Sequence, residues 1–181
     1  MIDSIPKEWE IIVIDGRWTG NKAPDKFSSK DLRDKVESYK NVTLVDGNDM
    51  EFEARNQYFE RAEMFDILIT IDSDEWIGTL NEELFYNYIN NLDGGMHYLE
   101  FSNTHKSGSR LYVNPFEWRY YKSHKYLKHN GKIQQINRPD SMVNGIELLT
   151  NDDLRTEEMI KYINDYQKQL WKYEDTLNFD N

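Results

Sequence analysis

The sequence predicts a single α/β domain: a small, mostly parallel sheet flanked by helices, followed by an aromatic β-hairpin region and a carboxyl-terminal helix. The apolar run at residues 67–71 contains no turn former, which indicates a short strand buried on both faces. A second run, residues 10–16, has the same design and ends in an acid and a glycine. Segments with helical spacing alternate with these runs, which favours strands packed between helices.

The other elements are expected from hydrophobic spacing and from start and stop signals. Residues 134–151 show no clear period, and Pro139 with Gly145 indicates irregular structure there. Met159, Ile163 and Leu170 fall on one face of the last predicted helix. In chain order we expect a loop at 17–27, a helix from Ser28 or Ser29 to Lys40, a strand at 41–47, a helix at 51–64, the strand at 67–71, a helix at 80–92 capped by Thr79, strands at 97–101, 110–113 and 116–121, and a helix at 156–175.

Length and composition restrict the possible classes. A chain of 181 residues suits one domain with a sizeable core. It carries 33 acidic against 22 basic residues, a net charge of −11, which makes a nucleic-acid partner a poor expectation. It has no cysteine, which excludes disulfides, thiolate nucleophiles and zinc sites built on cysteine. No run approaches ~18 apolar residues and no signal peptide is visible, so we expect a soluble, cytoplasmic protein without a membrane span.

Four acidic or polar residues come directly after the predicted strand at 67–71, which we call the central strand: Asp72, Ser73, Asp74 and Glu75. Three carboxylates at the end of a buried strand repel one another unless a cation lies between them. Carboxylate oxygens are ligands that Mg²⁺ and Mn²⁺ prefer. Ligands of open α/β sheets also gather outside the carboxyl ends of the strands. The pattern therefore predicts a divalent-metal site at Asp72 and Asp74.

In the predicted helix at 51–64, Arg55 and Asn56 interrupt the apolar face between Phe52 and Phe59. A buried guanidinium requires a carboxylate or phosphate partner. Two interpretations satisfy this requirement. Either Arg55 forms a structural ion pair with a nearby aspartate, or it points at the acidic cluster or at the anionic ligand of that cluster.

An Asp-x-Asp pair alone is not specific. It also occurs in phosphatases with an aspartyl nucleophile, in nucleic-acid-cleaving folds and as plain solvated acids. The haloacid type of phosphatase expects a small hydroxyl residue two places after the second aspartate, where this chain has Trp76. A purely structural acidic turn remains an alternative.

Three segments in order carry a resemblance: Ile-Val-Ile-Asp-Gly ending at 16, Ala-Arg-Asn at 54–56, and Ile-Leu-Ile-Thr-Ile-Asp-Ser-Asp-Glu at 67–75. From about residue 10 to 77 the chain resembles glycosyltransferases of the GT-A fold, and family 2 of these enzymes in particular. A weaker similarity to the same family lies at residues 119–124. The resemblance implies a Rossmann-like GT-A sheet in which Asp72 and Asp74 hold Mn²⁺ or Mg²⁺ against the diphosphate of a nucleotide-sugar. It places Asp15 near the base or ribose and Arg55 near the acidic cluster or the diphosphate, with His124 as a further metal contact.

The implied function is metal-dependent transfer of a sugar from a nucleotide-diphosphate sugar to an unknown sugar, lipid or protein acceptor. Residues 1–95 would form the nucleotide- and metal-binding half of the single domain 1–181. Residues 96–150 would form the acceptor-side hairpin region, and residues 151–181 the carboxyl-terminal helix.

An inverting transfer also requires a general base. Glu75 is the nearest candidate in the sequence, Glu117 and acids beyond Tyr121 stay open, and Glu75 serves equally well to order Arg55. For His124 the alternative is a surface histidine in a hairpin rich in tyrosine and lysine.

The chain departs from the family at its start. Only nine residues precede Glu10, where family members have a further strand and helix, and Gly-Arg-Trp follows Asp15. A nucleotidyltransferase acting on sugar phosphates is a rival, but residues 16–20 are a poor version of the glycine-rich, basic loop that it needs. A non-catalytic binding or assembly module is the other rival, and it predicts that the crevice near Asp72 is filled or collapsed.

Overall fold

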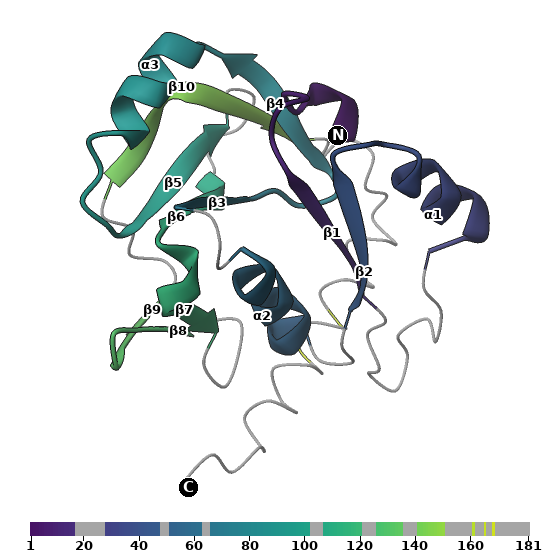
Figure 1. Ribbon diagram of the computed structural model, residues 1–181. Coiled ribbons are helices and arrows are strands. Elements are labelled where there is room, and N and C mark those ends of the chain that lie inside the picture. The colour runs from purple at the N-terminus through teal and green to yellow at the C-terminus, as the bar shows by residue number, and fades with distance from the viewer. Residues whose placement is uncertain are drawn as a thin grey trace, which may run out of the picture.

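The computed structural model describes residues 1–16, 28–47, 51–62, 66–101, 107–120, 126–135 and 141–150, together with residues 161, 165 and 168 (Figure 1). Strand is more abundant than helix, and the strands form three sheets. The predicted fold class, a GT-A-like, mostly parallel sheet flanked by helices, is therefore wrong. In the described residues, only two of the strand pairs are parallel, and most neighbouring strands run antiparallel.

The largest sheet has five strands in the order β3-β6-β5-β10-β4. The central strand of the sequence is β3, which pairs antiparallel with β6. Only β5 and β10 run parallel within this sheet. The strands are β3 (Ile67–Thr70), β4 (Glu75–Leu80), β5 (Met96–Phe101), β6 (Ser107–Val113) and β10 (Ser141–Thr150).

The two outer strands of this sheet are neighbours in the sequence. Only four residues, 71–74, join β3 at one edge to β4 at the opposite edge. A connection of this length spans at most about 17 Å, so the sheet must curl until its edges approach each other. The sheet is a curled half-barrel. The acidic residues of the sequence lie at the seam between its two edges.

Helix α3 (Glu82–Ile89) packs on β10 and covers one face of the five-stranded sheet (Figure 1). Asn81 caps this helix by accepting a hydrogen bond from the Leu84 N–H at 3.1 Å. The predicted cap, Thr79, lies inside β4 instead. The buried core between this helix and the sheet consists of Ile77, Phe85, Leu99, Phe101, Leu111, Val113, Val143, Ile146 and Leu148.

A second core lies on the other face of β5 and β6. There the helix α2 (Glu51–Arg61) and an antiparallel three-stranded sheet close over the large sheet. Asn56 joins the helix to the small sheet, because its side chain accepts a hydrogen bond from Tyr120 N at 2.7 Å and donates one to Tyr120 O at 3.1 Å. The small sheet contains β7 (Trp118–Tyr120), β8 (Tyr126–His129) and β9 (Lys132–Gln135), preceded by the 3-10 turn Pro115–Glu117. The buried side chains here are Phe59, Met96, Tyr112, Trp118, Tyr120 and Leu127.

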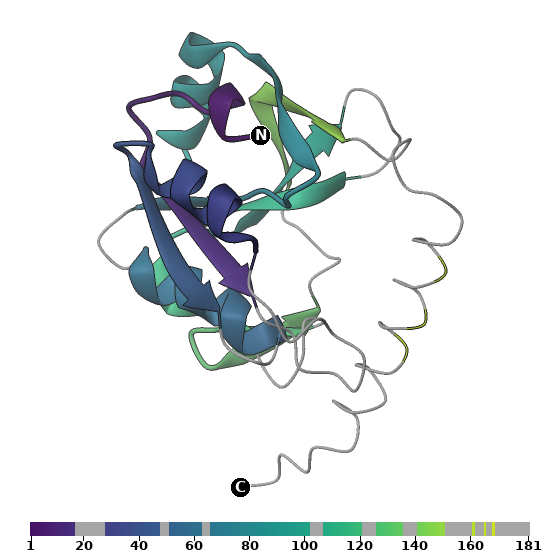
Figure 2. The same cartoon turned by 90° about the vertical axis from the view of Figure 1, so that its right-hand side faces the viewer.

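The remaining sheet is the parallel pair of β1 (Ile11–Gly16) and β2 (Val42–Gly47), which pair in register from Ile11 with Val42 to Gly16 with Gly47. Helix α1 (Lys30–Glu37) begins after Ser29, whose side chain accepts a hydrogen bond from Leu32 N, as the sequence predicted. Figure 2 views the molecule from the side on which this pair and α1 lie. Helix α2 packs against β1 as well as β7, so it links the parallel pair to the small sheet.

The first nine residues form no strand but cover an edge. The Ser4 hydroxyl, in the 3-10 turn Ile2–Ser4, accepts a hydrogen bond from Ile77 N at 3.0 Å. Trp9 donates from its indole N–H to the Tyr86 hydroxyl at 2.9 Å. The amino-terminal segment therefore satisfies part of the outer edge of β4, an edge that would otherwise be open to other chains.

The structure also bears on the expectations for residues 134–151 and for the carboxyl-terminal helix. Residues 141–150, predicted to be irregular, form the long strand β10 between β5 and β4, so the large sheet draws on both predicted halves of the domain. The predicted carboxyl-terminal helix lies outside the described residues except at 161, 165 and 168. No helix among the described residues is long and apolar enough to cross a membrane.

Candidate functional site

A cleft of about 940 Å³ lies between β1 and β3. Every residue of β1 and β3 borders it, α2 contributes Ala54, Arg55 and Tyr58, and Ala62 follows directly after that helix. The walls are therefore rich in isoleucine, and polar groups enter at the carboxyl ends of both strands. This arrangement of apolar walls with a few convergent polar groups is typical of small-molecule sites.

The cleft brings together three of the predicted site residues, Asp15, Arg55 and Asp72. Asp74 and Glu75 are not among its lining residues, although Ser73 is. His124, the third predicted metal ligand, lies outside the described residues.

The acidic residues form a tight turn. Glu75 N donates to Asp72 O at 3.0 Å, and the Glu75 carboxylate accepts a hydrogen bond from Asp72 N at 2.8 Å. Glu75 is buried, with 6% of its surface exposed. The Asp72 side chain is 61% exposed. Glu75 thus fixes the main chain of the turn, while the Asp72 carboxylate stays open to solvent and to the cleft.

Arg55 faces this turn from α2. Its Nη2 lies 4.0 Å from Asp72 Oδ1, at the outer limit of an ion pair. Its Nη1 donates to the Tyr58 hydroxyl at 3.4 Å, and its guanidinium lies 6.0 Å from the centre of the Tyr120 ring. The two interpretations of Arg55 therefore coincide, because its aspartate partner belongs to the acidic cluster.

Tyr58 is the hydrogen-bond partner of Arg55 on the same helix. Its burial raises the pKa of its hydroxyl well above the usual 10.0, Tyr120 adds to the rise, and Arg55 opposes it. The hydroxyl is therefore a neutral hydrogen-bonding group at physiological pH, and it supports Arg55 without competing for its charge.

Asp15 is engaged by its own neighbours. Its carboxylate accepts from Arg33 Nη1 at 2.6 Å and from the Ser28 hydroxyl at 2.9 Å. Arg33 Nη2 donates to Asp46 Oδ1 at 2.7 Å. The hydrogen bonds to Asp46 and Asp15 raise the pKa of Arg33, so Arg33 stays positively charged. Since Asp15 and Asp46 are register partners, this one guanidinium neutralises part of a repulsive cross-strand pair.

The donor set at the turn suits a metal that is shared with a ligand. No three His, Asp or Glu side chains come together as a metal-binding group in the part of the chain that the structure describes. Mg²⁺ is commonly held by one or two carboxylates, with water and substrate phosphates completing its shell. Asp72 fits that mode of binding because its carboxylate is exposed at the cleft, whereas Asp74 does not line the cleft.

Glu117, the other candidate base, does not line the cleft. Its carboxylate pairs with His129 Nε2 at 2.8 Å, and the His129 ring stacks on Trp118 with ring centres 4.1 Å apart. These contacts hold the small sheet together, which is a structural role.

The sequence interpretation missed Arg33, Ser28 and Tyr58, which all line the cleft. Two predicted strands that both end in Asp-Gly were the available signal for Arg33. If such strands pair in register, their two carboxylates lie side by side and need a cation.

Comparison with protein-family models, with curated proteins and with solved structures finds no match to this chain.

Proposed function

We propose that this protein is a metal-dependent glycosyltransferase that takes its sugar from a nucleotide-diphosphate sugar. One observation carries the proposal: an exposed aspartate, an arginine at 4.0 Å from it and the acid-terminated strand β1 all border one cleft. The open cleft also favours this function over a non-catalytic module, for which a filled crevice is expected.

Each group in the cleft has a chemical task. Asp72 in the cleft, with Asp74 two residues on in the same turn but outside the lining, would hold Mg²⁺ or Mn²⁺, which when bound supplies positive charge to the diphosphate as it leaves. Arg55 would bind a second phosphate oxygen, because an arginine fork matches phosphate geometry. The isoleucine walls exclude water and offer an apolar surface to the base.

Two predicted roles change under this proposal. Glu75 acts as a positioning residue, because it is buried and its carboxylate accepts the hydrogen bond from Asp72 N. Asp15 also acts by position: Arg33 and Ser28 occupy its oxygens, so it orients Arg33 at the end of the cleft and does not itself bind the ribose.

The test is calorimetric titration with UDP and GDP, with and without Mn²⁺, followed by assay of donor hydrolysis. We expect binding of at least one nucleotide only with the metal. Arg55→Ala should weaken that binding about 10- to 150-fold, as expected for loss of about 1.5–3 kcal/mol from a charged hydrogen bond.

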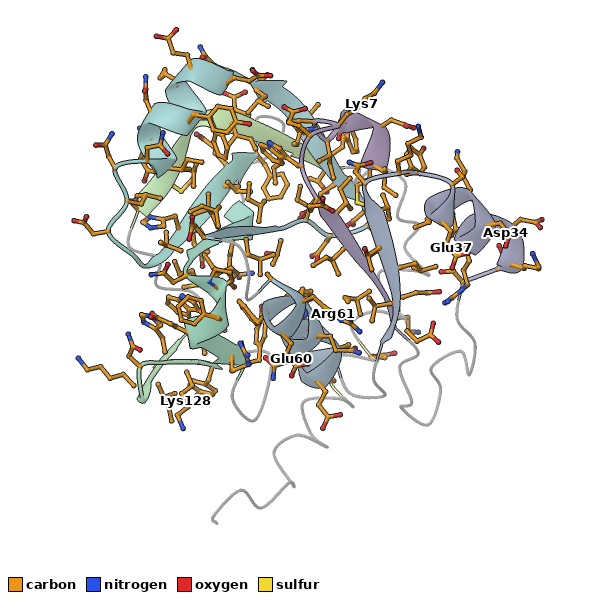
Figure 3. The ribbon with its side chains drawn as sticks, viewed as in Figure 1. Lys7, Asp34, Glu37, Glu60, Arg61 and Lys128 are labelled. Carbon is orange, nitrogen blue, oxygen red and sulfur yellow. The ribbon has the colours of Figure 1, made fainter. Side chains whose placement is uncertain are left out.

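Arg61→Ala is the matched control, since Arg61 lies on the same helix but is exposed outside the cleft (Figure 3). Absence of binding to both nucleotides with metal, or equal losses in the two arginine variants, would refute the proposal.

A further inference from the structure

Four polar groups meet at the amino ends of β5 and β10, away from the cleft. They are the Tyr88 hydroxyl on α3, the Gly94 carbonyl in the turn after α3, the His97 imidazole on β5 and the Ser141 hydroxyl on β10. None of these four residues lines the cleft. The cluster is therefore separate from the site described above.

The parallel pairing of β5 with β10 creates the central contact. His97 and Ser141 are register partners, so their side chains leave the sheet side by side. His97 lies two residues before Leu99, so strand alternation points it to the face that α3 covers. Ser141 Oγ lies 2.8 Å from His97 Nδ1, and His97 Nε2 lies 2.9 Å from Gly94 O. The Tyr88 hydroxyl lies 2.5 Å from Ser141 Oγ.

The Gly94 carbonyl selects one tautomer of the neutral His97 ring. A carbonyl oxygen only accepts, so Nε2 carries the ring proton and Nδ1 is left as an acceptor. The Ser141 hydroxyl therefore donates to Nδ1, and its oxygen accepts from the Tyr88 O–H. His97 is buried, with 4% of its surface exposed, whereas Ser141 is exposed. A hydroxyl open to solvent thus donates to a base whose ring the protein holds in place.

These contacts match the roles of a serine nucleophile, its general base and a group that orients the base. Ser38 gives a contrast within the chain. It is also exposed, but its hydroxyl donates to the Lys35 carbonyl, which does not take up a proton at neutral pH. Ser141 donates to a nitrogen that does.

We propose that Ser141, with His97 as its base, is the nucleophile of an esterase site for small carboxylic esters. Ser141 Oγ bonds to the ester carbonyl carbon as its proton moves to His97 Nδ1, and the Tyr88 O–H donates to the oxygen that becomes negative. The bond between this carbon and the alcohol oxygen then breaks, and the alcohol leaves with the proton from Nδ1. Water repeats the sequence on the acyl-serine and releases the acid, so ester and water give acid and alcohol.

The surroundings of His97 and Ser141 restrict the substrate. The group that orients His97 is a neutral carbonyl, which stabilises an imidazolium less than a carboxylate does. Esters with good leaving groups, such as phenyl esters, therefore suit the site better than amides. Because Ser141 lies at the surface and outside the cleft, the acyl group is a small one. The proposal does not depend on the proposed function.

The experiment combines hydrolysis of p-nitrophenyl acetate with labelling of the full chain by a fluorophosphonate probe, mapped by peptide mass spectrometry. We expect the label on Ser141 and none on Ser38. Ser141→Ala should abolish the labelling and the ester hydrolysis. His97→Gln should slow both at least about 100-fold, the smaller effect expected for loss of a general base. Tyr88→Phe should slow hydrolysis about 100-fold, as expected for loss of one donor to the oxyanion.

Ser38→Ala is the matched control, because it removes an exposed hydroxyl that donates to a backbone carbonyl. It should leave both the labelling of Ser141 and the hydrolysis unchanged. Urea unfolding of each variant shows whether the fold is retained. If the buried His97→Gln change unfolds the protein, Ser141→Ala still tests the proposal, since it alters an exposed side chain.

Several results would overturn the proposal. Ester hydrolysis by Ser141→Ala at the rate of the unaltered protein would remove the nucleophile. Equal labelling of Ser141 and Ser38, or unchanged labelling in a folded His97→Gln variant, would remove the base. An unlabelled Ser141 in the unaltered protein, with lower stability in Ser141→Ala, would assign the cluster a structural role only.

Discussion

Two groups of carboxylates follow strands in this protein, and they are satisfied in different ways. At the ends of β1 and β2, Asp15 and Asp46 share the guanidinium of Arg33 at 2.6 and 2.7 Å. At the turn between β3 and β4, Glu75 binds the main chain of Asp72, whose own carboxylate is 61% exposed. Asp46 is as exposed as Asp72, at 63%, so the difference lies in pairing: the first group is closed by a guanidinium at short range, whereas the Asp72 carboxylate lies 4.0 Å from Arg55 and is the open one. Only the second arrangement suits an exchangeable ligand, and the following changes test that difference.

The largest expected effect is at the end of the parallel pair. A Cβ added at Gly47 would lie 2.6 Å from the Gly16 Cα, a contact between two backbones that cannot both stay in place. Gly47→Ala should therefore destabilise the protein by about 1–3 kcal/mol, the usual cost of overpacking. Urea unfolding measures this change, with exposed Lys40→Ala as the control. An unchanged midpoint would show that the two strand ends are not closely paired.

Glu75→Ala should have the next largest effect. It leaves the Asp72 N–H without its acceptor and should lower the free energy of unfolding by about 1–3 kcal/mol. Glu75→Gln keeps an acceptor oxygen and should cost less. Equal loss of stability in both variants would mean that Glu75 acts through its charge and not through the hydrogen bond to Asp72.

Tyr58 and Tyr112 predict that the stability of the protein depends on alkaline pH. Burial raises the pKa of both Tyr58 and Tyr112 well above 10.0 in the folded protein, with Tyr120 adding to both rises. The folded state therefore holds these protons more tightly than the unfolded state, so stability falls as the pH rises above 10.

Tyr112→Phe should reduce that alkaline loss. At neutral pH it should change stability by no more than about 1 kcal/mol, because the neighbouring Tyr120 is the polar group that the Tyr112 hydroxyl interacts with and a single such interaction contributes about that much. Urea midpoints at neutral and alkaline pH test both statements. An undiminished alkaline loss in the variant would place its cause elsewhere.

The smallest effect on stability is expected at Asp72. Asp72→Asn alters an exposed side chain and should shift the free energy of unfolding by no more than about 0.5 kcal/mol. Asp15→Asn, by contrast, removes half of the charge that holds Arg33 and should lower the melting temperature. If the two variants ranked in the opposite order, the distinction between a closed and an open carboxylate group would be wrong.

The sequence predicted local structure better than pairing. Seven elements lie within the expected ranges, namely β1, α1, β2, α2, β3, α3 and β7, and Arg55 faces the acidic cluster. The fold class failed because a short apolar strand ending in an acid does not specify its neighbours. Beside β3 lies β6, which comes some forty residues later and runs antiparallel. Such pairings depend on distant contacts that no local spacing encodes.

Two local signals were also misleading. The acidic run 72–75 predicts a metal site, but its last residue, Glu75, is the first residue of strand β4. Gly145 in the sequence suggested irregular structure. In the structure it has a φ of +86°. It is required inside β10 because a Cβ there would lie 2.4 Å from the backbone nitrogen of Phe85 in α3. A glycine that permits a helix to approach a strand has the same sequence signal as one in a loop.

The most direct test of the open carboxylate is a count of bound Mn²⁺ by electron paramagnetic resonance, with UDP or GDP present. The account predicts that the unaltered protein retains Mn²⁺ with at least one nucleotide, that Asp72→Asn loses it, and that Asp93→Asn, an exposed acid outside the cleft, keeps it. Retention of the ion by Asp72→Asn, or no nucleotide-dependent Mn²⁺ in the unaltered protein, would contradict the account.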